Sequence, residues 1–225
     1  MSHEIEHTDT VISTKKEWHG LEIIKEELHP TIVDSDHRNE YFDIHEGTAY
    51  ADRYPEQREL LVDKANREGS LTTEEVNELV NTWAICPHNK ILTREFEGHP
   101  YGLGIPTTKY KSIENMKLVQ AVCSSLDDEG IKYTIQTLGT LRQGKLFFAS
   151  IEIADDAERV INGDNFQVYL NLLQSHDGSY AMTMFDSNMR VVCANTFKAS
   201  LNQQGDVSIK IKKTTNADLR LEEAG

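Results

Sequence analysis

A histidine and an aspartate are adjacent in the sequence SHDGS, at His176 and Asp177. An imidazole can act as a general base and a carboxylate can orient it, while Arg190, Cys193 and Asn195 could add a cation and polar groups. Neighbouring strand residues point to opposite faces, so His176 and Asp177 form no dyad unless a turn re-aims them. Ser, Asp and Asn also cap turns and helix starts. The pattern therefore favours structural roles, and we expect a protein without catalytic residues.

Cations and aromatic rings in the second half could bind a nucleic acid. Phosphates supply most of the affinity for such a ligand, and bases stack on aromatic faces. The candidate stacking residues are Phe147, Phe148 and Tyr180. The candidate nucleic-acid-binding residues are Lys109, Lys111, Arg142, Lys145, Arg190 and Lys198. Isolated cations at hairpin tips are usually solvated surface, and alternating aromatics usually form a core, so nucleic-acid binding stays a hypothesis beside that structural interpretation.

The cysteines offer little metal or disulfide chemistry. Cys86 and His88 are both potential zinc ligands, but Cys123 and Cys193 bring no further ligand at a recognisable spacing. We therefore expect no metal and no cofactor. Three widely spaced cysteines indicate no disulfide framework and fit a reducing cytoplasm. The first residues, MSHEIEHTDT, resemble no signal peptide, and no apolar run approaches the roughly 20 residues of a membrane span.

Charge is distributed unevenly along the 225 residues. The net charge is -14, and residues 1–100 hold 22 acidic and 10 basic side chains, which leaves residues 101–225 with 15 and 13. An acidic first half joined to a nearly neutral second half does not exclude binding to a polyanion. The acidic half could instead attract a basic partner protein.

The first half contains two predicted helices. Residues 1–16 are expected to be a disordered acidic tail, and residues 17–104 an acidic, mostly helical N-terminal region. Apolar residues at helical spacing predict helices over Pro55–Asn66 and Thr72–Ala84. In the second helix Val76, Leu79, Val80 and Trp83 form an apolar stripe. A glycine- and proline-rich loop, residues 98–106, is expected to follow.

The second half predicts an α+β core domain over residues 105–213. Here an antiparallel sheet of hairpins packs on one long helix, Ser112–Gly130, which Ser112 caps. Alternating apolar residues predict the strands, and residues 214–225 are expected to be a frayed tail. The predicted elements are a hairpin of residues 131–141 and 146–153, a hairpin of residues 166–172 and 180–184, a buried strand over residues 190–193, a helical piece over residues 198–203 and a last strand over residues 207–211.

Several motifs in this order resemble a family of phage and plasmid proteins known as domain of unknown function 932. The matching text runs from about Tyr110 to Asn202 and includes GTLRQGKLFFASIEI, SHDGS and RVVC followed by Asn195-Thr196. The WHGL tetrapeptide at residues 18–21 is also similar, whereas residues 55–97 are not. The resemblance implies a mobile-element origin and an intracellular life. It leaves the roles of its motif residues open, namely Trp18, His19, His176, Asp177 and Asn195.

Two functions without chemistry follow as hypotheses. The order of a helix, hairpins and a closing helix is similar to that of single-strand annealing recombinases, which predicts binding or annealing of single-stranded DNA during recombination or replication. The alternative is a module that binds a host enzyme or defence component through its acidic half. In either case we expect a cytoplasmic protein that does not contact membranes. We also expect a homo-oligomer, because the edge strands of the sheet offer a surface for assembly.

Overall fold

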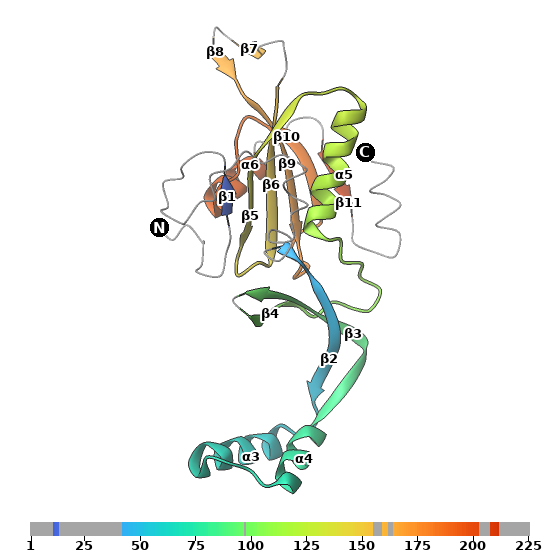
Figure 1. Ribbon diagram of the computed structural model, residues 1–225, viewed down its shortest axis with the longest axis vertical. Helices are drawn as coiled ribbons and strands as arrows, with labels where there is room; N and C mark the ends of the chain where they lie inside the picture. The colour runs from blue at the N-terminus through green and yellow to red at the C-terminus, as the bar shows by residue number, and fades with distance from the viewer. Residues whose placement is uncertain are drawn as a thin grey trace.

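The computed structural model describes residues 11–13, 42–96, 98–154, 159–161, 164–202 and 208–211, and confirms the α+β class (Figure 1). Its largest element is a six-stranded antiparallel sheet in the order β1-β5-β6-β9-β10-β11. The strands are β1 (Val11–Ser13), β5 (Tyr133–Leu141), β6 (Leu146–Ile153), β9 (Val168–Ser175), β10 (Met182–Ser187) and β11 (Ser208–Ile211). Short strands β7 (Arg159–Ile161) and β8 (Asp164–Phe166) pair with each other between β6 and β9.

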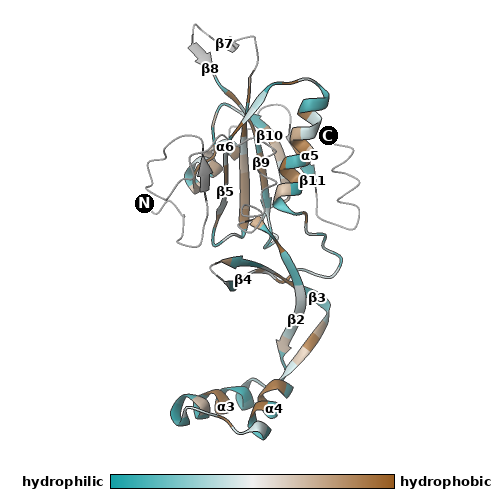
Figure 2. Cartoon of the chain, in the orientation of Figure 1, coloured by the Kyte–Doolittle hydropathy of each residue, from teal (hydrophilic) through white to brown (hydrophobic). Residues whose placement is uncertain are grey.

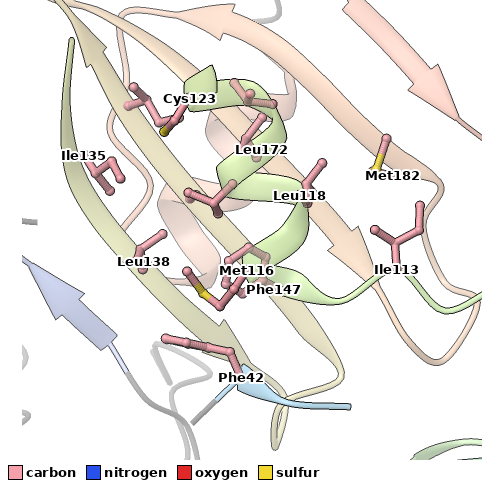
Figure 3. Packing of buried hydrophobic residues seen from close by; sticks show 14 of the residues in the cluster. Phe42, Ile113, Met116, Leu118, Cys123, Ile135, Leu138, Phe147, Leu172 and Met182 are labelled. Atoms are coloured by element: carbon pink, nitrogen blue, oxygen red, sulfur yellow. The ribbon is translucent and has the colours of Figure 1, made fainter. Parts of the chain in front are cut away.

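Two helices cover opposite faces of this sheet. Alternate strand residues point to opposite faces, and Phe147 belongs to the core cluster that includes residues of α5 (Asn115–Asp128). Its neighbour Phe148 belongs to a second cluster, with residues of α6 (Ala194–Asn202). Figure 3 shows the first cluster, where Met116 and Leu118 of α5 lie over the sheet. Both faces of β6 are therefore shielded from solvent, which explains why every residue from 146 to 151 is buried.

A separate three-stranded antiparallel sheet carries the helical hairpin. Its order is β2-β3-β4, with β2 at His45–Asp52, β3 at Trp83–Phe96 and β4 at His99–Gly104. Strand β3 has 14 residues and so extends over roughly 45 Å. Helices α3 (Pro55–Glu68) and α4 (Thr73–Asn81) lie at the end of the β2–β3 ribbon that is remote from the six-stranded sheet (Figure 1).

The prediction of a mostly helical N-terminal region is therefore wrong for residues 42–104. Strand residues outnumber helical residues there, because β2 and β3, which flank the helical hairpin in the sequence, pair with each other up to Asp52 opposite Trp83. The predicted loop at residues 98–106 is largely strand β4, whose Gly102 and Gly104 pair with β3. The prediction that the sheet packs on one long helix over residues 112–130 is also wrong, since α5 spans Asn115–Asp128 and α6 covers the opposite face of the sheet.

Two local predictions in the second half are corrected as well. Residues 190–193 do not form a strand, and the closing helix starts at Ala194, four residues earlier than predicted. Ser112 does not cap α5, because the N-cap residue is Glu114 and the Ser112 hydroxyl instead donates a hydrogen bond to Glu46. The two predicted hairpins and the strand at residues 208–211 are confirmed.

Residues 11–13 were predicted to be disordered, but they form β1, which pairs with β5. The remainder of the predicted tail, Trp18, His19 and the predicted C-terminal tail at residues 214–225 lie outside the described residues. Among the helices that the structure describes, none is long and apolar enough to cross a membrane.

Candidate functional site

His176 is buried directly after the end of β9. Its side chain is 0% exposed, and its Nε2 lies 2.9 Å from Oδ1 of Asn115, the first residue of α5. Its backbone N–H donates to the carbonyl of Lys145 at 2.8 Å. Asp177 is exposed and accepts a hydrogen bond from the Ser179 N–H at 2.8 Å, which is the geometry of an Asx turn. Burial keeps the imidazole away from an external substrate.

Asn115 connects His176 to the rest of a polar network that we call the buried junction. Its Nδ2 donates to the Phe42 carbonyl at 2.9 Å, and its Oδ1 also accepts from Nε2 of Gln174. The Tyr110 hydroxyl donates to the Ser175 carbonyl at 3.1 Å. Burial raises the pKa of Tyr110, and the nearby carboxylates of Asp177 and Glu46 raise it further. The phenol therefore stays a hydrogen-bond donor.

The buried junction joins the two sheets, and close backbone packing completes it. A Cβ atom on Gly104 of β4 would lie 2.6 Å from the His176 carbonyl oxygen. Beside it, Arg94 of β3 is only 2% exposed, with Nη1 3.4 Å from the Thr140 hydroxyl. The Arg94 side chain lies against Gly144 in the β5–β6 turn, where a Cβ atom would overlap it. Sequence analysis missed Arg94, because an arginine in a polar strand is usually exposed.

The region before α6 is held by side-chain capping. The Thr196 hydroxyl accepts hydrogen bonds from the N–H groups of Val192 and Cys193, at 2.9 and 3.0 Å. Cys193 is buried, and Asn195 is exposed on the first turn of the helix. Thr196 therefore holds the backbone before α6 in place. The sequence motif Asn195-Thr196 did not reveal this role.

In the part of the chain that the structure describes, the thiols and possible metal ligands show no reactive arrangement. Cys123 is buried in the α5 cluster, and burial raises the pKa of its thiol to about 11, which disfavours the nucleophilic thiolate. Within the described ranges, no group of three or more His, Cys, Asp or Glu side chains could hold a metal ion.

The six predicted nucleic-acid-binding cations fall into two groups. Lys109 and Lys111 flank Tyr110, and Arg142 and Lys145 form the β5–β6 turn, so these four surround the end of β9 at Ser175 and His176. Burial raises the pKa of Tyr169, and Arg190 lies close enough to the phenol to lower that pKa in part. Tyr169 and Ser175 are six residues apart on β9, roughly 20 Å. The exposed Lys198 lies on α6.

Two of the predicted stacking residues are unavailable to bases. Phe147 and Phe148 are both 0% exposed in the cores on either side of β6. Tyr180 is half-buried and packs edge-on against Phe197, with 5.4 Å between ring centroids. The proposal that Phe147 and Phe148 stack on bases is therefore wrong, because the alternating aromatics fill the core.

The exposed apolar surface lies at the other end of the molecule. Of the ten exposed large hydrophobic side chains among the described residues, eight lie between residues 50 and 85. Five of them form what we call the tip surface: Tyr50, Val76, Val80, Trp83 and Ile85. Figure 2 shows hydrophobic residues along α4 and the adjoining part of β3. Helix α4 has no buried residue, although it is strongly amphipathic.

Geometry makes the tip surface continuous. Val76, Val80 and Trp83 follow helical spacing, and Thr82 between the last two keeps right-handed helical dihedrals. Trp83 and Ile85 alternate on β3 and therefore share a face, on which Tyr50 of β2 is paired with Ile85. The five side chains are 44–63% exposed, and apolar side chains that gather in one exposed patch often mark an interaction site.

Polar contacts hold the tip in shape without covering this surface. Thr72 and Glu75 form a capping box at the start of α4, and the Glu75 carboxylate also pairs with Lys64 of α3. The Lys64 ammonium and the Thr72 N–H lower the pKa of Glu75 to about 2. On the border of the tip surface, Arg58 pairs with Asp52 and lies 5.8 Å above the Trp83 ring. The apolar face of α4 therefore points away from α3.

A second apolar feature adjoins α5. A cavity of about 180 Å³ lies between α5 and strands β9, β10 and β11, with Leu126, Leu170 and Met184 in its walls. Among the described residues that line it, Glu129 is the one ionisable residue. The cavity continues the core of the α5 face, since these apolar side chains also pack against that cluster.

Comparisons with known proteins identify a family but no relative of established activity. Residues 102–225, more than half of the chain, match the family model described as "Domain of unknown function (DUF932)". The match starts within β4 and so leaves the tip surface outside it. No curated protein and no solved structure matches significantly.

Proposed function

We propose that this chain, which belongs to the DUF932 family, is a non-catalytic module that binds a partner protein through the tip surface. The observation that supports the proposal is the uncovered apolar face of α4. Helical hairpins in folded chains normally bury such a face against a core, yet here the β2–β3 ribbon carries it away from both core clusters (Figure 1). Exposed apolar patches of this kind mark protein interaction sites.

The electrostatics favour a protein partner over a polyanion at the tip. Residues 50–85 hold eight acidic and four basic side chains, net -4. A negative field repels phosphates and raises the encounter rate with basic proteins. Under the mobile-element origin that the family resemblance implies, such a partner would be a host enzyme or a defence component in the cytoplasm.

Photo-crosslinking in cells tests this function. With Val80 replaced by p-benzoylphenylalanine, irradiation is expected to give a discrete adduct, because position 80 is 62% exposed in the isolated chain. The same probe at Lys132, an exposed residue just before β5, is the control and should give no matching adduct.

Repeating the crosslinking with a second substitution distinguishes binding at the tip surface from chance proximity to the probe. Val76→Glu places a charge on the tip surface and should remove the Val80 adduct, whereas Val62→Glu makes the same change at an exposed position of α3 outside that surface. An equal yield of the position-80 adduct in the Val76→Glu and Val62→Glu backgrounds would contradict the proposal.

Single-stranded DNA binding is a second candidate function. The gathering of Lys109, Lys111, Arg142 and Lys145 at one end of the six-stranded sheet favours it, although Asp177 and Glu46 add negative charge nearby. Any such site would follow the backbone phosphates, because the proposed stacking residues Phe147 and Phe148 are buried.

A salt series with paired variants tests the DNA candidate. If Lys109 and Lys145 contact phosphates, replacing both with alanine should flatten the slope of log affinity against log salt by about 1.4, since each contact to a single strand contributes about 0.7. The double variant Arg190→Ala/Lys198→Ala is the control with the same charge change. Equal effects of the two double variants, or no binding at low salt, would reject a DNA site at this end of the sheet.

A further inference from the structure

The side chains of the tip surface repeat with the spacing of a helix-pairing seam. Val76, Val80 and Trp83 are separated by four and then three residues, which is the spacing of the d and a positions in a coiled coil. The two positions that flank Val80 on this face, Asn77 and Leu79, are uncharged. Val76 and Val80 lie on α4, which ends at Asn81, and Trp83 and Ile85 of β3 with Tyr50 of β2 extend the stripe beyond the helix.

The narrow apolar stripe and the charge of the tip then restrict its partner. A narrow apolar stripe is matched by an amphipathic helix lying along it. A second copy of this chain would bring two tips of net -4 together, in chains that each carry -14. Like charges at such short range disfavour association, whereas a basic helix gains from the same field.

We infer that the tip surface binds an amphipathic helix of the partner whose apolar seam is flanked by lysine or arginine. This inference rests on the proposed function and adds the chemistry of the binding element. The partner's apolar side chains insert between Val76, Val80 and Trp83, and its cations face the carboxylates of the helical hairpin. Trp83, which is 44% exposed, becomes buried in the complex.

Two synthetic helices provide a direct test with defined probes. One has leucines at the four-three spacing and lysines elsewhere, and the other has glutamates in place of the lysines. Neither contains tryptophan, so in a Trp18→Phe background the emission of Trp83 alone reports binding. The lysine helix is expected to shift Trp83 emission to the blue and to bind at least about tenfold more tightly than the glutamate helix, a preference that falls with added salt.

Variants of the protein place the binding on the tip surface. Val80→Glu should weaken binding of the lysine helix by about tenfold or more, and Val62→Glu should leave it unchanged. Equal binding of the two helices, or no binding of either while the Val80 crosslink in cells persists, would overturn the inference and leave the proposed function in place. Absence of both the peptide signal and the crosslink would overturn both.

Discussion

Gly104→Ala is expected to destabilise the protein by about 2–3 kcal/mol, because β4 approaches the end of β9 too closely for a side chain. The added Cβ atom would lie 2.6 Å from the His176 carbonyl oxygen and 3.1 Å from the Asp177 Cα. Both neighbours are backbone atoms, so rotation of a side chain cannot relieve the overlap. The two sheets must separate or distort, and the free energy of unfolding measured by urea denaturation should fall.

The control for this substitution is Gly102→Ala on the same strand. A Cβ atom at Gly102 has nothing within 4 Å, and its backbone is not left-handed. Its effect should remain within about 0.5 kcal/mol of the parent protein. Equal stability of the two variants would show that β4 does not pack against residues 176 and 177 in solution.

Asn115→Ala is expected to have an effect of similar size, about 2–4 kcal/mol, because one side chain satisfies several buried groups. It bonds the Phe42 carbonyl, the His176 ring and the Gln174 amide, and its own residue is 1% exposed. Removing it leaves those partners buried without that bond, and each such loss costs about 1 kcal/mol or more. Urea denaturation measures the change.

Asn77→Ala is the matched control for Asn115→Ala. Asn77 is exposed in the middle of α4, and alanine is the better helix former, so its substitution should change the free energy of unfolding by no more than about 0.5 kcal/mol. A similar small effect of Asn115→Ala would contradict the buried junction as the connection between the two sheets.

Local patterns in the sequence predicted most of the core domain. The Arg142–Lys145 turn between two apolar runs identified the β5–β6 hairpin, and Asp177-Gly178 identified the turn between β9 and β10. Helix α5 was visible from its apolar face, although Ser112 was the wrong cap. These elements depend on contacts between neighbours in the chain, which periodicity and turn residues report directly.

Long-range pairing was not predictable in the same way. Strands β2 and β3 meet only after the chain has passed through two helices, and β3 contains Pro87 and many polar residues. Its buried residues include the charged Arg94 beside Leu92, and its exposed residues include Trp83 and Ile85, so the apolar–polar alternation that marks a half-buried strand is missing. The burial of Arg94 and of Asn115 likewise depends on residues 46 to 73 positions away in the sequence.

The candidate site shows what periodicity does and does not convey. Helical spacing identified the stripe of Val76, Val80 and Trp83, although the predicted helix ran too far, because α4 ends at Asn81 and Trp83 begins β3. Spacing reveals only that one face is apolar. Whether the chain itself covers that face depends on where β2 and β3 carry the helix. The cations illustrate the same limit. Lys145 lies near the end of β9 and Arg190 near its start, and only the tertiary structure reveals this separation.

The mass of the adduct formed from position 80 in cells tests the central claim most directly. The account predicts a discrete species whose mass equals this chain plus one different protein, and its loss in the Val76→Glu background. An adduct with the mass of two copies of this chain would contradict a partner protein at the tip surface. The absence of any adduct from position 80, as from the control at Lys132, would contradict it as well.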